Sequence, residues 1–412
     1  MATNAYGKTD TLYNFENVIG SANGDIIVGN SLSNSILGGA GADTITGGAG
    51  SDILLGAAGD DKFIFTNTEF GADTSVGGGD DTDTLEITDA AAVSDSDFSN
   101  ISMMEKIVLS SDNAHTLTLG TNANTAGIKE IDATAALSSS VTLNVSSMSN
   151  DLKIDTSDTA DSVVLSGGAD TLHTYNGNDT IEYGSAAKVD NGPSKPSDTI
   201  DAGAGTDTLF ANSAEDYNLS NASISSVETL KFYQGSADQS IVISGDQNLE
   251  ITTFEGSAAQ NNTLQVENTL STNNVDLSTG KTLTSIENTI INSNYNINST
   301  LIGNSATKDT ITGSAADDVI SGLGSDDILN NVANAIKLDQ NGVKLQGGTN
   351  TDTYTYDQAN FDANDTLDGS SGTDELILDS SVGNATKVLS NFANVSNIEK
   401  LTLTSGADNL DL

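Results

Sequence analysis

The sequence predicts an all-β solenoid, in which short strands stack coil upon coil. An unbroken nine-residue period runs from Gly20 to Ile64, and a fixed period of this kind is typical of repeat architectures. The composition agrees, because 40 glycines, two prolines and no tryptophan leave few large side chains for a deep globular core. We therefore expect one extended repeat structure with intervening β-strand modules, each coil contacting only its neighbours.

The period is carried by five consecutive units: GSANGDIIV, GNSLSNSIL, GGAGADTIT, GGAGSDILL and GAAGDDKFI. The sixth position is acidic or its amide: Asp25, Asn34, Asp43, Asp52 and Asp61. The eighth position is always apolar: Ile27, Ile36, Ile45, Leu54 and Phe63. The end of each unit is thus a short strand whose eighth residue points inward. With two units per coil, Asp25, Asp43 and Asp61 stack along one edge, and Asn34 and Asp52 along the other.

The chemistry of each unit lies in its turn. Glycines allow positive φ and expose backbone carbonyls, while the aspartate adds a carboxylate. Hard oxygen ligands in a tight turn suit calcium.

GGAGADTIT and GGAGSDILL resemble the RTX (repeats-in-toxin) nonapeptide family, whose pattern is glycine, glycine, any, glycine, any, aspartate, any, apolar, any. The resemblance implies a calcium-binding parallel β-roll with the ions between successive turns. It makes calcium ligands of Asp43, Asp52 and Asp61, with the carbonyls of Gly38, Gly39, Gly41, Gly47, Gly48 and Gly50 nearby. Asp25 is in register without the full glycine pattern, and Asn34 offers only a neutral oxygen, so we expect weaker sites there.

Two further clusters keep the spacing with fewer glycines: Asp161, Asp170 and Asp179, then Asp309, Asp318 and Asp327. We include Asp170, Asp179, Asp318 and Asp327 among the candidate calcium ligands. The alternative is that hydrogen bonds alone hold these coils. Their apolar partners are expected to be shifted in places by one residue, through bulges or a slipped register. Single copies at Asp83, Asp207, Asp352 and Asp374 are each expected to open a β-rich stretch.

A second motif, apolar-Glu-any-apolar, recurs at Glu16, Glu105, Glu228 and Glu399. We interpret these glutamates as solvated or strand-pairing. The motifs divide the chain into modules 1–98, 99–210 and 211–378, with 379–412 beginning a further module or ending the protein. Only Thr68 to Phe70 and Asn330 to Lys337 invite helices, both short.

The charge of −44, from 14 basic and 58 acidic residues, favours bound cations, because empty acidic sites repel one another. It argues against nucleic acid as a partner. The absence of cysteine excludes disulfides and thiolate metal sites. No segment has the length of a membrane span, and the first ten residues show no cleavable export signal. The chain reads as a piece of a longer array, or else as one ending in a type I secretion signal at 408–412.

A catalytic role is not expected. The two histidines, His115 and His173, are each followed by threonine, so there is no His-Glu-x-x-His motif, and no Gly-x-Ser-x-Gly appears. A glycosidase pair needs an aromatic-lined sugar cleft, which a chain without tryptophan assembles with difficulty.

What remains is a secreted protein of the bacterial cell surface that binds calcium and self-assembles into an S-layer-like lattice or filament. We expect its partners to be other copies and cell-surface polysaccharide. The alternatives are a fragment of an RTX adhesin or biofilm-matrix protein, and the non-catalytic repeat region of a secreted RTX enzyme.

Overall fold

In the computed structural model nearly all regular secondary structure is β-strand, and the described strands pair in parallel apart from the antiparallel pair β1 (Ala2–Thr3) and β2 (Thr9–Asp10). The prediction of a parallel β-solenoid is confirmed. The structure describes residues 2–3, 9–10, 15–90, 92–183, 198–212, 216–233, 238–256, 262–268, 274–277, 281–284, 286, 288–293, 300–302, 308–312, 319–321, 328–330, 336–338, 344–346, 353–357, 366–369, 372–379, 386–388, 392–403 and 409–411.

The chain forms two compact units: residues 1–213 with 222–227, and residues 214–221 with 228–412. The four modules predicted from the motifs are a different division and stay a prediction.

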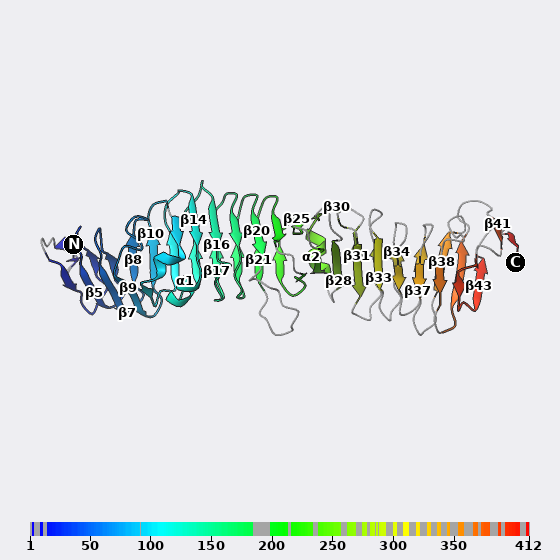
Figure 1. Ribbon diagram of the computed structural model, residues 1–412, viewed down its shortest axis with the longest axis horizontal. Coiled ribbons are helices and arrows are strands. Elements are labelled where there is room, and N and C mark those ends of the chain that lie inside the picture. Colours follow the sequence, from blue (N-terminus) through cyan, green and yellow to red (C-terminus); the bar gives the residue numbers. More distant parts are fainter. Residues whose placement is uncertain are drawn as a thin grey trace. The chain divides into compact units, whose positions relative to one another are not determined.

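The first unit is built on one sheet that runs through all of it, here called the long sheet (Figure 1). Its ten strands are β4 (Ile26–Val28), β6 (Thr44–Thr46), β8 (Lys62–Phe65), β10 (Thr84–Ile87), β13 (Lys106–Leu109), β15 (Glu130–Asp132), β17 (Lys153–Asp155), β19 (Thr171–His173), β21 (Thr199–Asp201) and β24 (Ser223–Ser225). Consecutive members alternate in sequence with strands of other sheets. Each coil therefore adds one strand to the long sheet.

Two further sheets complete the coils of this unit. The first, the N-terminal sheet, contains β3 (Asn17–Ile19), β5 (Ser35–Ala40), β7 (Ile53–Ala58), β9 (Ser75–Asp80) and β12 (Ile101–Ser102). The second begins as the first one ends, with β11 (Ala92–Ser94), β14 (His115–Thr118), β16 (Val141–Asn144), β18 (Ser162–Val164), β20 (Thr180–Tyr183) and β22 (Thr208–Ala211).

Short helices lie where one sheet replaces the other. The α1 helix (Thr121–Ala126) contacts both the 3₁₀ helix η1 (Asp95–Phe98) and β12, the last strand of the N-terminal sheet. The Asp95 carboxylate accepts hydrogen bonds from the N–H groups of Gly120, Asn122 and Ala123 at 2.7–3.1 Å, so it satisfies the first turn of α1. This helix was not predicted.

The helix predicted at Thr68 to Phe70 is wrong, and the one predicted at Asn330 to Lys337 is contradicted at both ends, while residues 331–335 lie outside the described residues. Residues 68–70 form a hydrogen-bonded turn, in which the Phe70 N–H donates to the Thr66 carbonyl at 3.0 Å. Asn330 ends strand β35 (Ile328–Asn330), and Lys337 lies in β36 (Ile336–Leu338).

The core consists of columns of apolar side chains between the sheets. In the long sheet, Ile27, Ile45 and Phe63 lie in register on successive strands and are buried. Burying each such side chain contributes roughly 1.5–3 kcal/mol. The shift expected for the apolar residues of the two later clusters is wrong. Val163 pairs with Ile181 and Ile311 with Leu329, so in both clusters the residue two positions after the aspartate remains in register.

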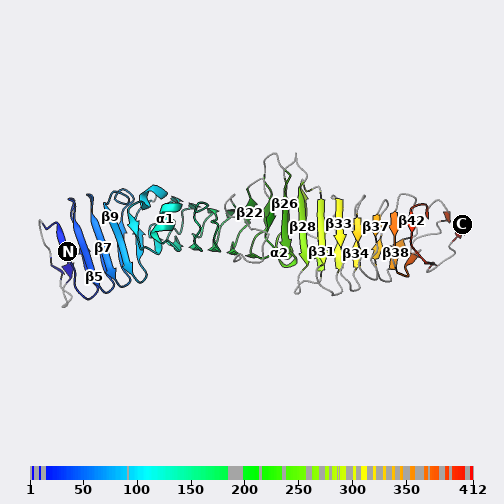
Figure 2. The same cartoon turned by 60° about the horizontal axis from the view of Figure 1, so that its bottom comes forward.

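The second unit repeats this construction (Figure 2). Its largest sheet contains β23 (Tyr217–Asn218), β26 (Ser240–Ser244), β28 (Thr263–Asn268), β31 (Asn288–Ser293), β33 (Lys308–Thr312), β35, β37 (Lys344–Gln346), β39 (Thr366–Asp368) and β42 (Val395–Ser396). Smaller groups are β25 (Thr229–Lys231), β27 (Thr253–Glu255) and β30 (Thr282–Thr284); β29 (Asn274–Asp276), β32 (Thr300–Ile302) and β34 (Val319–Ser321); β36, β38 (Thr353–Asp357), β40 (Glu375–Asp379) and β43 (Lys400–Leu403); and β41 (Thr386–Val388) with β44 (Asn409–Asp411). The α2 helix (Gly245–Glu250) follows β26. None of the helices described in either unit is long and apolar enough to cross a membrane.

Candidate metal centre

The sixth-position aspartates of the first unit form hydrogen-bonded columns, here called aspartate ladders. In the first ladder the Asp25 N–H donates to Asp43 Oδ1 at 2.7 Å, and the Asp43 N–H donates to Asp61 Oδ1 at 2.8 Å. The next donor is the Asp61 N–H, which reaches Asp83 Oδ1 at 2.9 Å. Each carboxylate therefore accepts the backbone N–H of the aspartate one coil earlier. The single copy at Asp83 continues the ladder directly.

A second ladder lies on the other edge of the same coils. The Asn34 N–H donates to Asp52 Oδ1 at 2.6 Å, and the Asp52 N–H donates to Asp73 Oδ1 at 2.9 Å. The predicted placement of alternate units on two edges is confirmed. Asp73 was missed because one extra residue separates it from its strand, forming a bulge where the N–H groups of Thr74 and Ser75 both approach the Asp52 carbonyl.

The glutamate motif ends a ladder. The Asp83 N–H donates to Glu105 Oε2 at 2.9 Å, and in the second unit the Asp374 N–H donates to Glu399 Oε2 at 2.8 Å. Each glutamate occupies the position of the next aspartate. The strand-pairing interpretation of these two residues is thus extended to a specific role for their side chains.

The middle coils contain two more ladders. In one, the N–H groups of Val141, Asp161 and Asp179 donate to Asp161, Asp179 and Asp207, each at 2.7 Å. In the other, the Leu152 N–H donates to Asp170 Oδ1 at 3.1 Å, and the Asp170 N–H to Asp198 Oδ1 at 2.8 Å.

The second carboxylate oxygen is left open in the glycine-rich units. Oδ2 is buried and has no hydrogen-bond partner among the described residues in Asp43, Asp52, Asp61 and Asp83, which we call the open aspartates. The same holds for Asp179 Oδ2 in the middle coils. A buried carboxylate oxygen without a partner is costly. Such an atom indicates a ligand that the protein chain itself does not supply.

The open oxygens face spaces that only glycine leaves. A Cβ added to Gly38 would lie 2.2 Å from Asp43 Oδ2 and 2.9 Å from the Gly56 carbonyl oxygen of the next coil. At Gly47 the same atom would lie 2.4 Å from Asp52 Oδ2. Each space thus has a carboxylate at its border, joined at Gly38 by a carbonyl from the following coil.

The turn backbone is held in the left-handed region. Gly39 and Gly48, at the second position, have φ of 121° and 88°, and Gly41 and Gly50, at the fourth, have 93° and 132°. Glycine adopts these values without a steric penalty. The prediction that these glycines allow positive φ is therefore confirmed.

Electrostatics at the open aspartates favour a cation. Burial raises the pKa values of Asp43, Asp52 and Asp61, and raises that of Asp83 to about 6. A bound divalent cation would favour the ionised form. No group of three or more His, Cys, Asp or Glu side chains gathers around a possible metal position in the described part of the chain. Further ligands would therefore be backbone carbonyls, and the donor set of carboxylate and carbonyl oxygens fits calcium.

The remaining predicted ligands fall into different environments. Asp25 Oδ2 accepts the Ser21 N–H of its own turn at 2.5 Å, and Asp170 Oδ2 accepts the Ser166 N–H at 3.0 Å. Asp179 resembles the open aspartates, because its Oδ2 is buried without a hydrogen-bond partner among the described residues and burial raises its pKa to about 6. Asp318 and Asp327 lie outside the described residues. Calcium ligation by all of these residues stays a prediction.

The stacked parallel coils and their aspartate ladders define a β-roll protein built from nonapeptide turns. The family described as the RTX calcium-binding nonapeptide repeat (4 copies) matches residues 28–63, 155–186, 197–217, 304–331 and 361–380. The chain therefore contains RTX calcium-binding repeats, as the resemblance predicted. No curated protein matches it.

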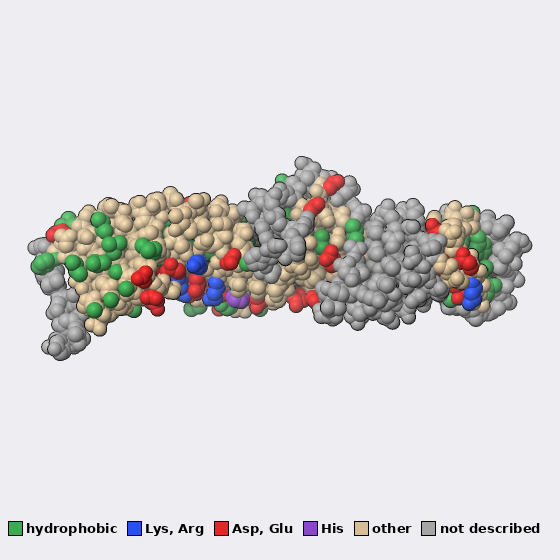
Figure 3. Space-filling model, turned by 90° about the horizontal axis from the view of Figure 1, so that it is seen from below, with side chains coloured by type: hydrophobic (Ala, Val, Ile, Leu, Met, Phe, Trp, Pro, Cys, Tyr) green, Lys and Arg blue, Asp and Glu red, His purple; other side chains and the backbone are tan. Residues whose placement is uncertain are grey.

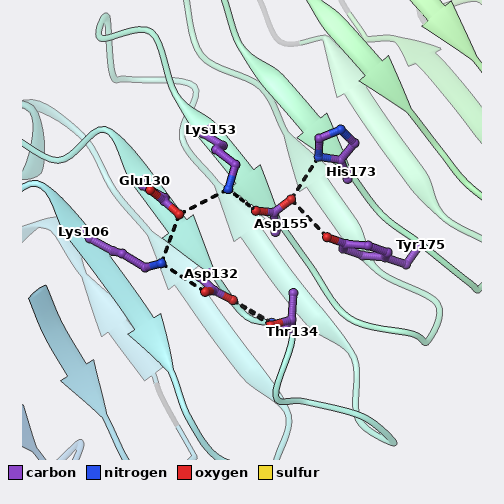
Figure 4. A network of polar contacts seen from close by, with 8 residues as sticks. All are labelled: Lys106, Glu130, Asp132, Thr134, Lys153, Asp155, His173 and Tyr175. Atoms are coloured by element: carbon purple, nitrogen blue, oxygen red, sulfur yellow. Dashed lines mark hydrogen bonds and ion pairs between the residues drawn. The ribbon is translucent and has the colours of Figure 1, made fainter.

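A separate polar network covers the outer face of the long sheet (Figure 4). Lys106 pairs with Glu130 and Asp132 at 3.0 and 3.2 Å, and Lys153 pairs with Glu130 and Asp155 at 3.2 and 2.6 Å. Exposed ion pairs contribute only about 0.2–1 kcal/mol each. Their main effect here is to place positive charge among the acids of β15 and β17.

His173 belongs to the same network. Its Nδ1 lies 2.9 Å from Asp155 Oδ1, which the Tyr175 hydroxyl also contacts at 3.2 Å. Although burial opposes ionisation of Asp155, hydrogen bonds from Lys153, His173 and Tyr175 lower its pKa. Asp155 and His173 are register partners on the adjacent strands β17 and β19.

Proposed function

We propose that this protein is an extracellular, calcium-dependent structural protein that assembles with copies of itself on the bacterial surface. The observation that carries the proposal is the column of open aspartates, each with a buried carboxylate oxygen facing a glycine turn. The RTX-repeat match supports calcium as the ligand and export by type I secretion.

Folding on calcium follows from the residues of the first unit. Asp43, Asp52, Asp61 and Asp83 would hold the ions together with backbone carbonyls of the glycine turns. Calcium when bound supplies the positive charge that a buried carboxylate needs. Because the ladders join successive coils, holding one carboxylate also fixes the hydrogen bond from the coil before it.

Self-association is supported by apolar side chains on the first coils. Phe15, Ile19, Ile26 and Leu32 are exposed, with 78% of Ile19 accessible, and hydrophobic side chains gather at this end of the first unit (Figure 3). Exposed apolar patches of this kind mark interaction surfaces. We take a second copy of the chain as the occupant because β3, which carries Ile19, is the last strand of its sheet, and terminal strands pair readily with other strands.

The proposed role is non-catalytic. The contact of His173 with the Asp155 carboxylate is accounted for by the charged network on the sheet face.

Electron microscopy of the full chain with calcium and with a chelator tests this function. Ordered sheets or filaments that dissolve on chelation are expected. Dispersed monomers at millimolar calcium would overturn the assembly and favour a fragment of an adhesin.

A further inference from the structure

Two ladder aspartates already have every carboxylate oxygen satisfied. The Ser157 N–H and hydroxyl both donate to Asp161 Oδ2 at 2.9 Å. The Ser166 N–H and hydroxyl donate to Asp170 Oδ2 at 3.0 and 2.9 Å. Both serines and both aspartates are buried, so these contacts are not replaced by bulk water. We call this pair the serine-satisfied aspartates.

The second residue of each unit decides between the two arrangements. In the units of Asp43, Asp52 and Asp61 that residue has positive φ: Gly39, Gly48 and Ala57, at 121°, 88° and 92°. Ser157 and Ser166 occupy the equivalent position and are not among the described residues with positive φ. Their N–H groups therefore point at the carboxylate. A glycine turn instead leaves the oxygen open.

The other oxygen of each serine-satisfied aspartate is also occupied. Asp161 Oδ1 accepts the Val141 N–H at 2.7 Å and shares the single Ser157 hydroxyl proton with Oδ2, the hydroxyl oxygen lying 2.8 Å from Oδ1. Asp170 Oδ1 accepts the Leu152 N–H at 3.1 Å and shares the Ser166 hydroxyl proton in the same way, at 2.9 Å. A calcium ion would have to displace donors that are already in place, whereas at Asp43 or Asp52 it meets an unpartnered oxygen.

We propose that the coils carrying Asp161 and Asp170 hold together without calcium, although they lie in a segment, 155–186, that matches the calcium-binding repeat. In these coils the serine N–H and hydroxyl groups satisfy the buried carboxylate oxygens, which in the glycine-rich coils we expect calcium to bind. The first unit therefore contains a calcium-independent segment, residues 141–173, in addition to the earlier coils that order when calcium binds. The contrast between residues 141–173 and the glycine-rich coils rests on the proposed calcium-dependent folding. The expected stability of residues 141–173 in chelator is independent of that proposal.

Hydrogen exchange of the full chain, measured by mass spectrometry in chelator and in millimolar calcium, separates these points. Peptides covering residues 141–173 should be protected in both conditions, while those covering 38–64 should gain protection only with calcium. Equal calcium dependence in the two segments would overturn the inference. Protection of both segments in chelator would leave the inference standing and contradict calcium-dependent folding instead.

Substitution of the serines tests the mechanism. The double variant Ser157→Gly with Ser166→Gly removes both hydroxyls and allows positive φ, so protection of 141–173 in chelator should fall by about tenfold or more and return with calcium. Ser147→Gly, in the exposed turn after β16, controls for added backbone freedom and should change little. Ser166→Ala keeps the N–H donor, so a smaller loss without calcium rescue is expected. Full protection of the double variant in chelator would overturn the assignment.

Discussion

At the scale of single residues, the most informative atoms are the open carboxylate oxygens. We expect Asp52→Asn or Asp61→Asn to raise the calcium concentration needed for folding by about tenfold, because an amide keeps the ladder acceptor but loses the charge that attracts the ion. Circular dichroism during a calcium titration measures this. Asp158→Asn is the matched control, since exposed Asp158 only accepts the Asn176 side chain. Equal effects of the control and ladder variants would contradict the assignment.

The serine-satisfied coils predict how stability depends on pH without calcium. Burial raises the pKa of Asp170 from 3.8 to about 6, so between these values the folded coils retain a proton that the unfolded chain releases. The free energy of unfolding of these coils in chelator should therefore fall as pH rises from about 4 to about 6. Asp155 has a lowered pKa and acts in the opposite direction, mainly below about pH 4. Urea unfolding at several pH values checks the sign, and a rise through this window would contradict it.

One second-position residue is strained. Ala57 has φ of 92°, a conformation that costs a non-glycine residue about 1–3 kcal/mol. Ala57→Gly should therefore raise the free energy of unfolding by about 1 kcal/mol, measured by urea denaturation in calcium. The neighbouring Ala58, in β7 and without positive φ, is the control. Ala58→Gly should lower stability by about 0.5–1 kcal/mol, and a loss in both variants would remove the evidence for strain.

At the scale of strands and helices, the end of a ladder is the critical contact. Glu105→Ala removes the acceptor for the Asp83 N–H, and an unpaired buried N–H costs about 1–3 kcal/mol. Glu105→Gln retains an acceptor oxygen and should lose much less. Thermal unfolding of both variants in calcium tests the difference. If the two variants lost the same stability, the charge of Glu105 rather than its hydrogen bond would matter.

The strands of residues 20–64 could be predicted because one pattern encodes both turn and core. Glycine, aspartate and the apolar eighth residue recur at fixed positions, and Ile45 lies where that pattern places it. The α1 helix could not be predicted, because its six residues lack an apolar period and its first turn is satisfied by Asp95, about 25 residues earlier. Asp73 was hidden because it lies 21 residues after Asp52 instead of 18, and because one further residue separates it from its strand. The contrast between serine and glycine at the second position was visible in the sequence but had no meaning without the hydrogen bonds.

At the scale of the whole molecule, the net charge of −44 makes folding and assembly depend on counter-ions. In chelator we expect low β content outside the serine-satisfied coils, and in calcium a full β spectrum, because filled sites remove the repulsion between acids. Circular dichroism across a calcium titration tests this at the level of the whole chain. A β signal indifferent to calcium would contradict it.

Assembly gives a second prediction at this scale. Ile19→Ser should weaken self-association in calcium without changing the folded structure, because Ile19 is 78% exposed on the terminal strand β3. Leu137→Ser, at a residue 64% exposed elsewhere in the first unit, is the matched control. Sedimentation velocity over a range of protein concentrations measures the effect. If both variants self-associated to the same extent, the apolar surface around Ile19 would not be the site of assembly.

The ladder partners of Asp25, Asp43 and Asn34 each lie 18 residues, or two units, further along the chain. An insertion or deletion therefore preserves the ladders only if it contains an even number of units. Loss of residues 38–55, one whole coil, would bring the Asp25 N–H to Asp61 and the Asn34 N–H to Asp73, leaving every later strand on its own sheet. Loss of only the nine residues 47–55 would exchange the two edges for every later coil. Gene duplications within this repeat should therefore survive in steps of two units, and a single unit should be gained or lost only where the sheets themselves change over.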